Sequence, residues 1–337
     1  MCKNIAKSEH LNMNNQTRDN LIAVIRENIR DKANLTTYLS DILNIGRESA
    51  YRRIRGEINF TFEEIIILSQ DLGFSVDNII GAKKDENALF NIHMLSQNMG
   101  YFDIYVKKMT EYGHLFQKAR NVPDAKARMS INTLPYFFHI SYKALSRFRI
   151  YKWLYQNRKI TSYDKFSDFE LPEKVWDAHK FLYESIQAVP NVLVVMDHNI
   201  IRTVVREIEY FQKRSLLSND DLQLLKGELN DIVNALEKMA IEGKCKHDAN
   251  LELYVSEVDL EASYLHFECS GNQFAQVRIY SISAIDSFNE GLCRIQKNWI
   301  ESLKRYSVLI SGSGEMQRFD FLKEQRRYIN KITSFMI

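Results

Sequence analysis

Glycine, proline and cysteine are all scarce in this chain of 337 residues. The 12 glycines and 4 prolines fall well below the average combined usage of about 12 % for these two residues. This scarcity excludes a collagen-like or linker-rich protein and argues against a many-turned β-sandwich. The 4 cysteines include no C-x-x-C pair, and a chain of this size needs no disulfide staples, so we expect reduced thiols.

An excess of one charge and a long hydrophobic run are also absent. The formal net charge is +2, so any nucleic-acid binding must come from a local patch and not from the whole molecule. The longest run of aliphatic residues and methionine, 192–196, is far shorter than the roughly 20 residues of a membrane span. The first residues contain no apolar signal core. These absences predict a cytoplasmic protein without a membrane partner.

Size and composition predict a globular chain of more than one domain. Typical domains hold about 100 to 150 residues, and the 45 % of hydrophobic and 12 % of aromatic residues are enough for large cores. We expect a mainly α fold with a small antiparallel β-sheet. The predicted regions are a small helical domain over 16–84, a larger helical domain over 85–250, and an α+β region over 251–337 that packs with 85–250 as one unit.

The N-terminal region contains short amphipathic helices in close succession. Apolar residues recur there at helical spacing, and capping residues such as Thr61 precede the stripes while glycines such as Gly56 and Gly73 follow them. The pattern predicts five helices, over 17–29, 35–43, 47–55, 61–73 and 75–80.

The second and third of these helices are separated by a short turn. Ser40 is small enough to let two helices cross closely, and Asn44 tolerates the left-handed conformation that such a turn requires. Ala50 and Ile54 lie on one side of the third helix and predict its buried face. The order of helix, turn and helix is typical of a DNA-binding helix-turn-helix.

Positive charge is concentrated on the outward side of the third helix. Residues 46–56 hold four arginines against the single acid Glu48. The first turn of such a helix reaches base edges, and arginines beyond it reach phosphates or guanines. A solvated, arginine-rich helix surface is the alternative interpretation. The candidate DNA-binding residues are Arg47, Glu48, Ser49, Tyr51, Arg52, Arg53 and Arg55.

Residues 18–83 resemble the lambda-repressor-like (XRE-type) helix-turn-helix regulators. The resemblance lies in YLSDILNIGRESAYRRIRGE and FTFEEIIILSQDLGFSVDNIIG and covers about a fifth of the chain. It implies a five-helix domain whose third helix enters the major groove with Arg47, Glu48, Ser49, Arg52 and, more weakly, Tyr51. The sequence departs from the family pattern at Asn44, where the turn glycine is usual, and at Ile54, which follows Ala50 by four residues.

The remaining residues predict helices and a few strands. The segment 88–95 fits either a strand or the start of a helix. Alternating apolar residues predict a meander of antiparallel strands over 251–258, 263–269 and 274–282, with a hairpin turn at 270–272, and a short strand over 308–310. Helical periodicity predicts helices over 101–118, 136–155, 172–188, 197–213, 219–242, 287–306 and 315–335.

Three other groups of polar residues could bind a ligand or take part in catalysis, but a structural role explains each of them more simply. The segment 311–315 fits an anion-binding loop less well than a tight helix start, because no P-loop lysine follows it. Cys245, His247 and Asp248 resemble metal ligands only in type, and a surface loop is favoured. Asp197 and His198 resemble half of an acid–base pair, although a helix cap is the simpler role for Asp197.

The aromatic-rich segment 136–155 fits a ligand cavity or, more simply, a hydrophobic core. No catalytic, metal-binding or cofactor-binding residue is predicted, and we do not expect an enzyme. The sequence predicts a regulator of transcription that binds double-stranded DNA, with a C-terminal part that forms a homodimer, senses a small-molecule or protein effector, or does both. Two alternatives stay open: a scaffold that uses the helix-turn-helix fold for a protein partner, and an enzyme in the C-terminal part.

Overall fold

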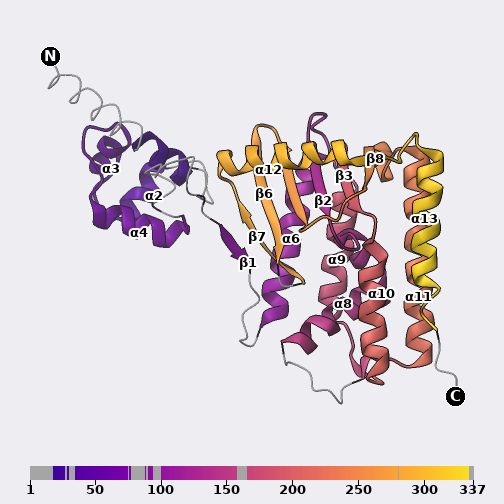
Figure 1. Cartoon of the computed structure of the whole chain (residues 1–337). Helices are drawn as coiled ribbons and strands as arrows, with labels where there is room; N and C mark the ends of the chain where they lie inside the picture. The colour runs from indigo at the N-terminus through magenta and orange to yellow at the C-terminus, as the bar shows by residue number, and fades with distance from the viewer. Residues whose placement is uncertain are drawn as a thin grey trace. The chain divides into compact units, whose positions relative to one another are not determined.

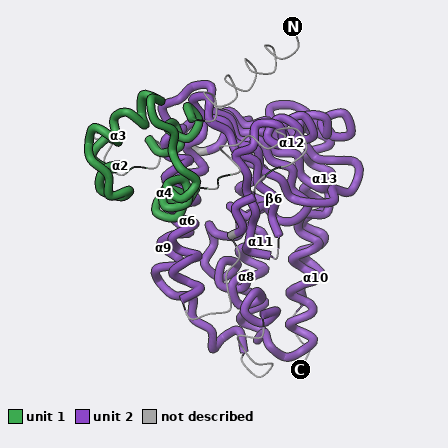
Figure 2. The backbone as a smooth tube through the Cα atoms, turned by 90° about the vertical axis from the view of Figure 1, so that its left-hand side faces the viewer, with its two compact units in different colours: residues 1–89 green, residues 90–337 purple. Residues whose placement is uncertain are grey.

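The computed structural model describes residues 18–26, 29, 35–74, 76, 88, 90–93, 100–157, 165–279 and 281–333. The chain divides into two compact units, residues 1–89 and 90–337, which Figure 2 shows in different colours. Each unit has its own hydrophobic core. Within the described ranges, no helix combines the length and the apolar character that crossing a bilayer requires.

The regular elements described in the first unit are all helices. A helix over 18–26 precedes α2 (Leu35–Ile42), α3 (Arg47–Ile54) and α4 (Phe62–Leu72). Thr61 caps α4 in a capping box with Glu64, and Gly73 ends it with φ +71°, as the sequence predicted. The predicted fifth helix over 75–80 lies outside the described residues except for Val76. The core of this unit consists of Leu21, Ile25, Ile29, Leu39, Ala50, Leu68 and Phe74.

The second unit is built on one eight-stranded mixed sheet of order β1-β7-β6-β5-β2-β3-β4-β8. The neighbours β2, β3 and β4 are parallel, and every other neighbouring pair is antiparallel. The strands are β1 (Asn91–His93), β2 (Lys126–Ile131), β3 (Asn191–Asp197), β4 (Asn250–Ser256), β5 (Tyr264–Cys269), β6 (Asn272–Ile279), β7 (Ser283–Ser287) and β8 (Ser307–Leu309).

Helices cover both faces of this sheet. On one face, α12 (Glu290–Ser302) runs across the strands, as Figure 1 shows, and packs on β2, β5 and β6. The opposite face holds the large core, and there α13 packs on α10 and α11. The other α-helices of this unit are α6 (Tyr101–Ala119), α7 (Tyr136–Ser141), α8 (Lys143–Gln156), α9 (Glu173–Ile186), α10 (Ile200–Lys213), α11 (Asn219–Glu242) and α13 (Glu315–Ile329). Short 3₁₀ segments are η1 (Phe166–Asp168), η2 (Lys246–Asp248) and η3 (Leu303–Tyr306).

The predicted mainly α fold with a small antiparallel sheet is wrong. Four of the eight strands, β1, β2, β3 and β7, were not assigned as strands by the sequence patterns. Residues 191–197 form β3 between two parallel neighbours, and a strand buried on both faces loses the alternation that marks a half-exposed one. The predicted helix over 197–213 is therefore shorter and begins at Ile200.

The predicted meander is right in one part and wrong in another. Strands β5 and β6 form the expected hairpin, with Ser270 at φ +50° and Gly271 at φ +79°. However, β4 lies on the far side of β2 and β3 and pairs in parallel with β3. The meander consists instead of β5, β6 and β7, followed by β1 at the edge. Parallel strands such as β3 and β4 are joined through crossover helices and pair with strands far away in the sequence. The alternation of apolar and polar residues along one strand does not show which strand it pairs with.

Helix positions were predicted more closely than strands. The longest helix among the described residues, α11, has the predicted range, 219–242; Ser218 caps its start and Gly243, with φ +62°, ends it. The predicted helix over 136–155 is divided into α7 and α8, because Tyr142 adopts an extended backbone with φ −122° and ψ 131°.

Candidate functional site

The turn between α2 and α3 is closed by local hydrogen bonds. Asn44 adopts the left-handed conformation, φ +52°, as its side chain type predicted. The amide of Ile45 donates to the Ser40 carbonyl at 3.0 Å, and the Ser40 hydroxyl donates to the Ile45 carbonyl at 2.5 Å. These two bonds fix the entry of α3. Ala50 is fully buried, so the side of α3 that the sequence assigned to the core is the side that packs.

The opposite side of α3 presents arginines to solvent. The side chains of Arg47, Arg52 and Arg55 are exposed, as are those of Glu48 and Tyr51. Tyr51 is 47 % exposed, and the Arg55 guanidinium lies 5.7 Å from the centre of its ring. Five of the seven predicted DNA-binding residues are therefore exposed on α3 or at its C-cap, Arg55.

Glu57, just beyond α3, partly offsets this positive charge. Its carboxylate lies 3.3 Å from Nε of Arg52 and 3.2 Å from Nε of Arg55. All three side chains are at least 41 % exposed, and ion pairs between exposed groups contribute little free energy because water screens them. Both guanidinium groups can therefore exchange Glu57 for a phosphate at small cost.

Arg53 and Ser49 lie differently from the other candidates. Arg53 forms a two-bond pair with Glu64, with Nη2 to Oε1 at 2.7 Å and Nε to Oε2 at 3.0 Å, and its side chain is only 11 % exposed. Burial alone would raise the pKa of Glu64, but the bonds from Arg53 and from the Thr61 amide lower it below its ordinary value. Arg53 thus joins α3 to the capping box of α4. Ser49 is half-buried.

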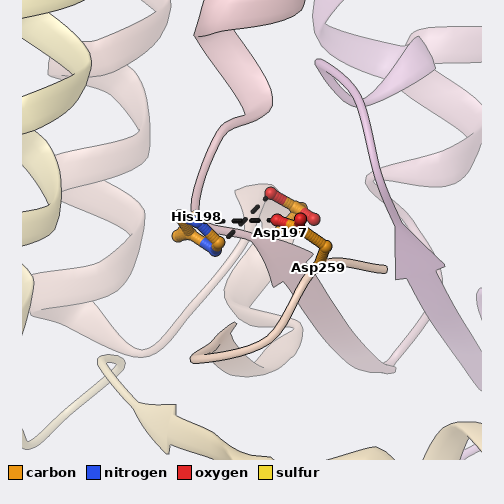
Figure 3. A group of neighbouring side chains, drawn as sticks. All are labelled: Asp197, His198 and Asp259. Carbon is orange, nitrogen blue, oxygen red and sulfur yellow. Dashed lines mark ion pairs between the residues drawn. The ribbon is translucent and has the colours of Figure 1, made fainter. Parts of the chain in front are cut away.

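Asp197, His198 and Asp259 form a cluster at the end of β3 that joins neighbouring parts of the chain (Figure 3). The Nδ1 and Nε2 atoms of His198 lie 3.7 Å from Asp197 and 3.6 Å from Asp259. Both oxygens of the buried Asp197 already accept backbone amides, from Asn199 at 2.7 Å and from Leu260 at 2.8 Å. The N-cap position of α10 belongs to Asn199, so the cap role predicted for Asp197 is wrong. Asp197 instead joins β3 to the loop at Leu260.

This group is also the one set of three His, Cys, Asp or Glu side chains, among the described residues, whose ligand atoms could surround a metal ion. Its geometry is poor for that purpose, because the Asp259 side chain is 84 % exposed and the Asp197 oxygens are engaged. Cys245, His247 and Asp248 do not form such a set. Burial raises the pKa of Cys245 to about 12, so its thiol stays protonated.

The segment 311–315 is a tight helix start. Its hydrogen-bonding groups are engaged inside the protein, since the Gly312 amide donates to the Ala240 carbonyl and the Ser311 hydroxyl accepts from the Leu253 amide, both at 2.9 Å. Gly314 has φ +68°, and a Cβ there would lie 2.2 Å from the Leu309 carbonyl oxygen. Only glycine fits this turn, which supports the structural reading over an anion-binding loop.

A polar pocket of about 650 Å³ in the second unit was not predicted. It lies beyond the carboxyl end of β2, the edge at which ligands of open α/β sheets bind. Arg149 and Lys152 reach it from α8, Glu207 from α10 and Arg278 from β6. The one signal in the sequence is a pair of cations, three residues apart, in an aromatic segment that otherwise fits a core. Arg278 is distant in the sequence and reaches the pocket because β6 lies in the same sheet. No pattern near Arg278 in the sequence indicates this position.

Comparison with known proteins gives no assignment: no family model matches this chain, and neither a curated protein nor a solved structure does.

Proposed function

We propose that this protein is a sequence-specific DNA-binding regulator of transcription that uses α3 as its recognition helix. The observation that carries the proposal is the set of three exposed arginines, Arg47 and Arg52 on α3 and Arg55 at its C-cap, which follow the turn closed by Ser40 and Asn44. The resemblance of residues 18–83 to the lambda-repressor-like regulators supports the same function. The cytoplasmic location expected from the sequence is part of the same proposal.

In the proposed complex, the first turn of α3 faces base edges and the arginines beyond it reach guanines or phosphates. Arg47 and Glu48 occupy that first turn, and Arg52 follows on the exposed face. Arg53 is not used, because its guanidinium is held by Glu64. A homodimer would present two such helices to half-sites about 34 Å apart, and the second unit would supply dimerisation or the response to an effector.

The first experiment is selection of bound fragments from a random duplex library with the full chain at physiological salt. The expected result is a palindromic motif. If Arg52 reads a guanine with two hydrogen bonds, Arg52→Ala removes about 1 to 3 kcal/mol of discrimination at one position. If Arg52 contacts a phosphate, binding weakens equally on all sequences and its salt dependence becomes shallower.

Arg26→Ala is the matched control, because Arg26 is an exposed arginine of the same unit outside α3. It is expected to leave both the motif and the affinity unchanged. Binding that is equally weak for wild type and Arg52→Ala, with no salt dependence, would contradict DNA recognition by α3. That outcome would favour a protein partner for the first unit, since a protein partner need not release counterions.

A further inference from the structure

The pocket in the second unit carries more positive than negative charge near its centre. Arg149, Lys152 and Arg278 line it, against the carboxylates of Glu207 and Glu261. Glu207 is committed to Lys152, whose Nζ lies 2.6 Å from its Oε1, and Glu261 is exposed. The guanidinium groups of Arg149 and Arg278 are left to face the pocket together.

These two arginines have no carboxylate within ion-pair distance anywhere in the described ranges. Arg149 is 6 % exposed and donates to the Ser281 carbonyl, while its buried Nε has no hydrogen-bond partner. The guanidinium carbons of Arg149 and Arg278 lie 4.9 and 4.2 Å from the centre of the Tyr136 ring. Two like charges are thus gathered over one aromatic ring in a poorly solvated place, which is costly unless an anion joins them.

The electrostatics of the neighbouring groups agree with this geometry. Burial and the charge of Arg149 lower the pKa of Arg278 to about 10, so this guanidinium stays charged at neutral pH. Burial, Arg149, Lys152 and Arg278 also hold the pKa of His139 well below its ordinary value. His139 is therefore a neutral hydrogen-bonding group beside three cations.

Buried polar atoms at the pocket lack partners in the protein. His139 is 3 % exposed and its Nδ1 has no hydrogen bond, and the Oγ of Ser281 has none either. Native proteins satisfy nearly all buried polar atoms, with protein groups, water or a ligand. Together with Nε of Arg149, these atoms form a set of unsatisfied groups that belong to residues lining the pocket.

An apolar cavity of about 110 Å³ borders the polar pocket, and the two share Thr133, Ser263 and Arg278 in their walls. Its lining is mainly aliphatic, methionine and aromatic side chains, among them Met109 and Phe116. A dry cavity of about 150 Å³ holds a benzene ring, so this one has room for a short alkyl chain or a small ring portion.

We propose that this pocket binds a small organic anion, a carboxylate or a phosphate monoester that carries a short apolar group. The guanidinium groups of Arg149 and Arg278 hold the anion, because their fork of donors matches carboxylate and phosphate oxygens. The apolar group enters the cavity beyond Thr133. The binding site lies wholly within the second unit and does not depend on DNA binding by the first.

The test is calorimetric titration of the full chain with hexanoate and with butyl phosphate, at constant ionic strength set by sodium chloride. Acetate, inorganic phosphate and neutral 1-butanol are the comparison probes. We expect saturable binding of hexanoate or butyl phosphate, tighter than that of acetate or inorganic phosphate, and none of butanol. The better of the two organic anions identifies the headgroup as carboxylate or phosphate. No saturable binding of any anion overturns the proposal.

Arg149→Met separates anion binding from a structural role. The variant is expected to bind the anion about tenfold more weakly or worse, since a charged hydrogen bond is lost. Without the anion, it is expected to be as resistant to heat as wild type. Arg305→Met, at an exposed arginine of the same unit, is expected to leave the affinity unchanged. If Arg149→Met does not fold, Arg278→Met serves the same purpose at a half-buried site. Wild-type anion affinity in the folded variant overturns the proposal.

Discussion

The two units place arginine in opposite surroundings. In the first unit, Arg52 and Arg55 lie on the exposed face of α3 and share the carboxylate of Glu57. In the second unit, Arg149 is buried and Arg278 half-buried. Both guanidinium groups lie near the Tyr136 ring, and neither has a carboxylate within ion-pair distance among the described residues. An exposed arginine is ready for a large polyanion that approaches from solvent. A buried arginine without a carboxylate fits the small anion that we propose for the pocket.

The difference shows that the neighbours of an arginine, more than its burial, decide its role. Arg128 has a side chain only 8 % exposed, yet Glu268 and Glu301 each lie 2.8 Å from its guanidinium. These bonds, with others from Lys297 and Lys304, lower the pKa of both carboxyls below the ordinary value although burial alone would raise it. Arg128 is a structural tie between β2, β5 and α12, whereas Arg149 is buried without a carboxylate within ion-pair distance among the described residues.

Replacing these two buried arginines is the sharpest test of that contrast. Arg128→Met leaves Glu268 and Glu301 without their central cation and is expected to lower the free energy of unfolding by about 3 kcal/mol. Arg149→Met removes an unpaired charge, and its free energy of unfolding without anion is expected to equal or exceed that of wild type. Urea unfolding of both variants measures the difference. Equal losses would show that Arg149 is as structural as Arg128.

The sequence predicted the first unit better than the second because its signals are local. Asn44 and Ala50 lie within one helix-turn-helix segment, and each has the conformation or burial that its type indicated. The sheet of the second unit joins strands far apart in the chain. Parallel β3 has no exposed face to produce alternation, and nothing near β4 indicates that β2 and β3 lie between it and β5.

The candidate sites follow the same rule. The exposed arginines of α3 were predicted because periodicity on one helix separates a buried face from an exposed face. Periodicity does not show which exposed side chain turns toward a neighbouring helix, so the pair of Arg53 with Glu64 was not foreseen. The basic pocket needs Arg149 from α8 and Arg278 from β6, and 129 positions separate them in the sequence.

The second prediction concerns Arg53, the candidate that the structure assigns to packing. Arg53→Met is expected to lower the stability of the first unit by about 2 kcal/mol at neutral pH, because Glu64 loses its partner. The folded-state pKa of Glu64 is lowered, so its contribution is present above the ordinary glutamate pKa of about 4.3 and is lost as pH falls through the folded value. The deficit of the variant should therefore shrink in acid.

Hydrogen exchange of the Ala50 and Leu68 amides in the full chain measures this stability, since both residues are fully buried in the first unit. The double variant Arg53→Met with Glu64→Gln is the control, because it removes the charge on both sides and should recover part of the loss. A deficit that is the same at neutral and acid pH would exclude the ion pair as its cause.

The smallest expected effect belongs to the exposed pair, and it tests whether the arginines of α3 are free for DNA. Glu57→Gln is expected to change stability by no more than about 0.5 kcal/mol, since all three side chains of the group are largely exposed. It should strengthen binding to the selected operator several-fold, because Arg52 and Arg55 no longer have to break their ion pairs with Glu57 before they contact a phosphate. Glu63→Gln, at an exposed acid in the first turn of α4, makes the same change in net charge and should strengthen binding less. Weaker binding of Glu57→Gln would mean that Glu57 orients the arginines instead of competing for them.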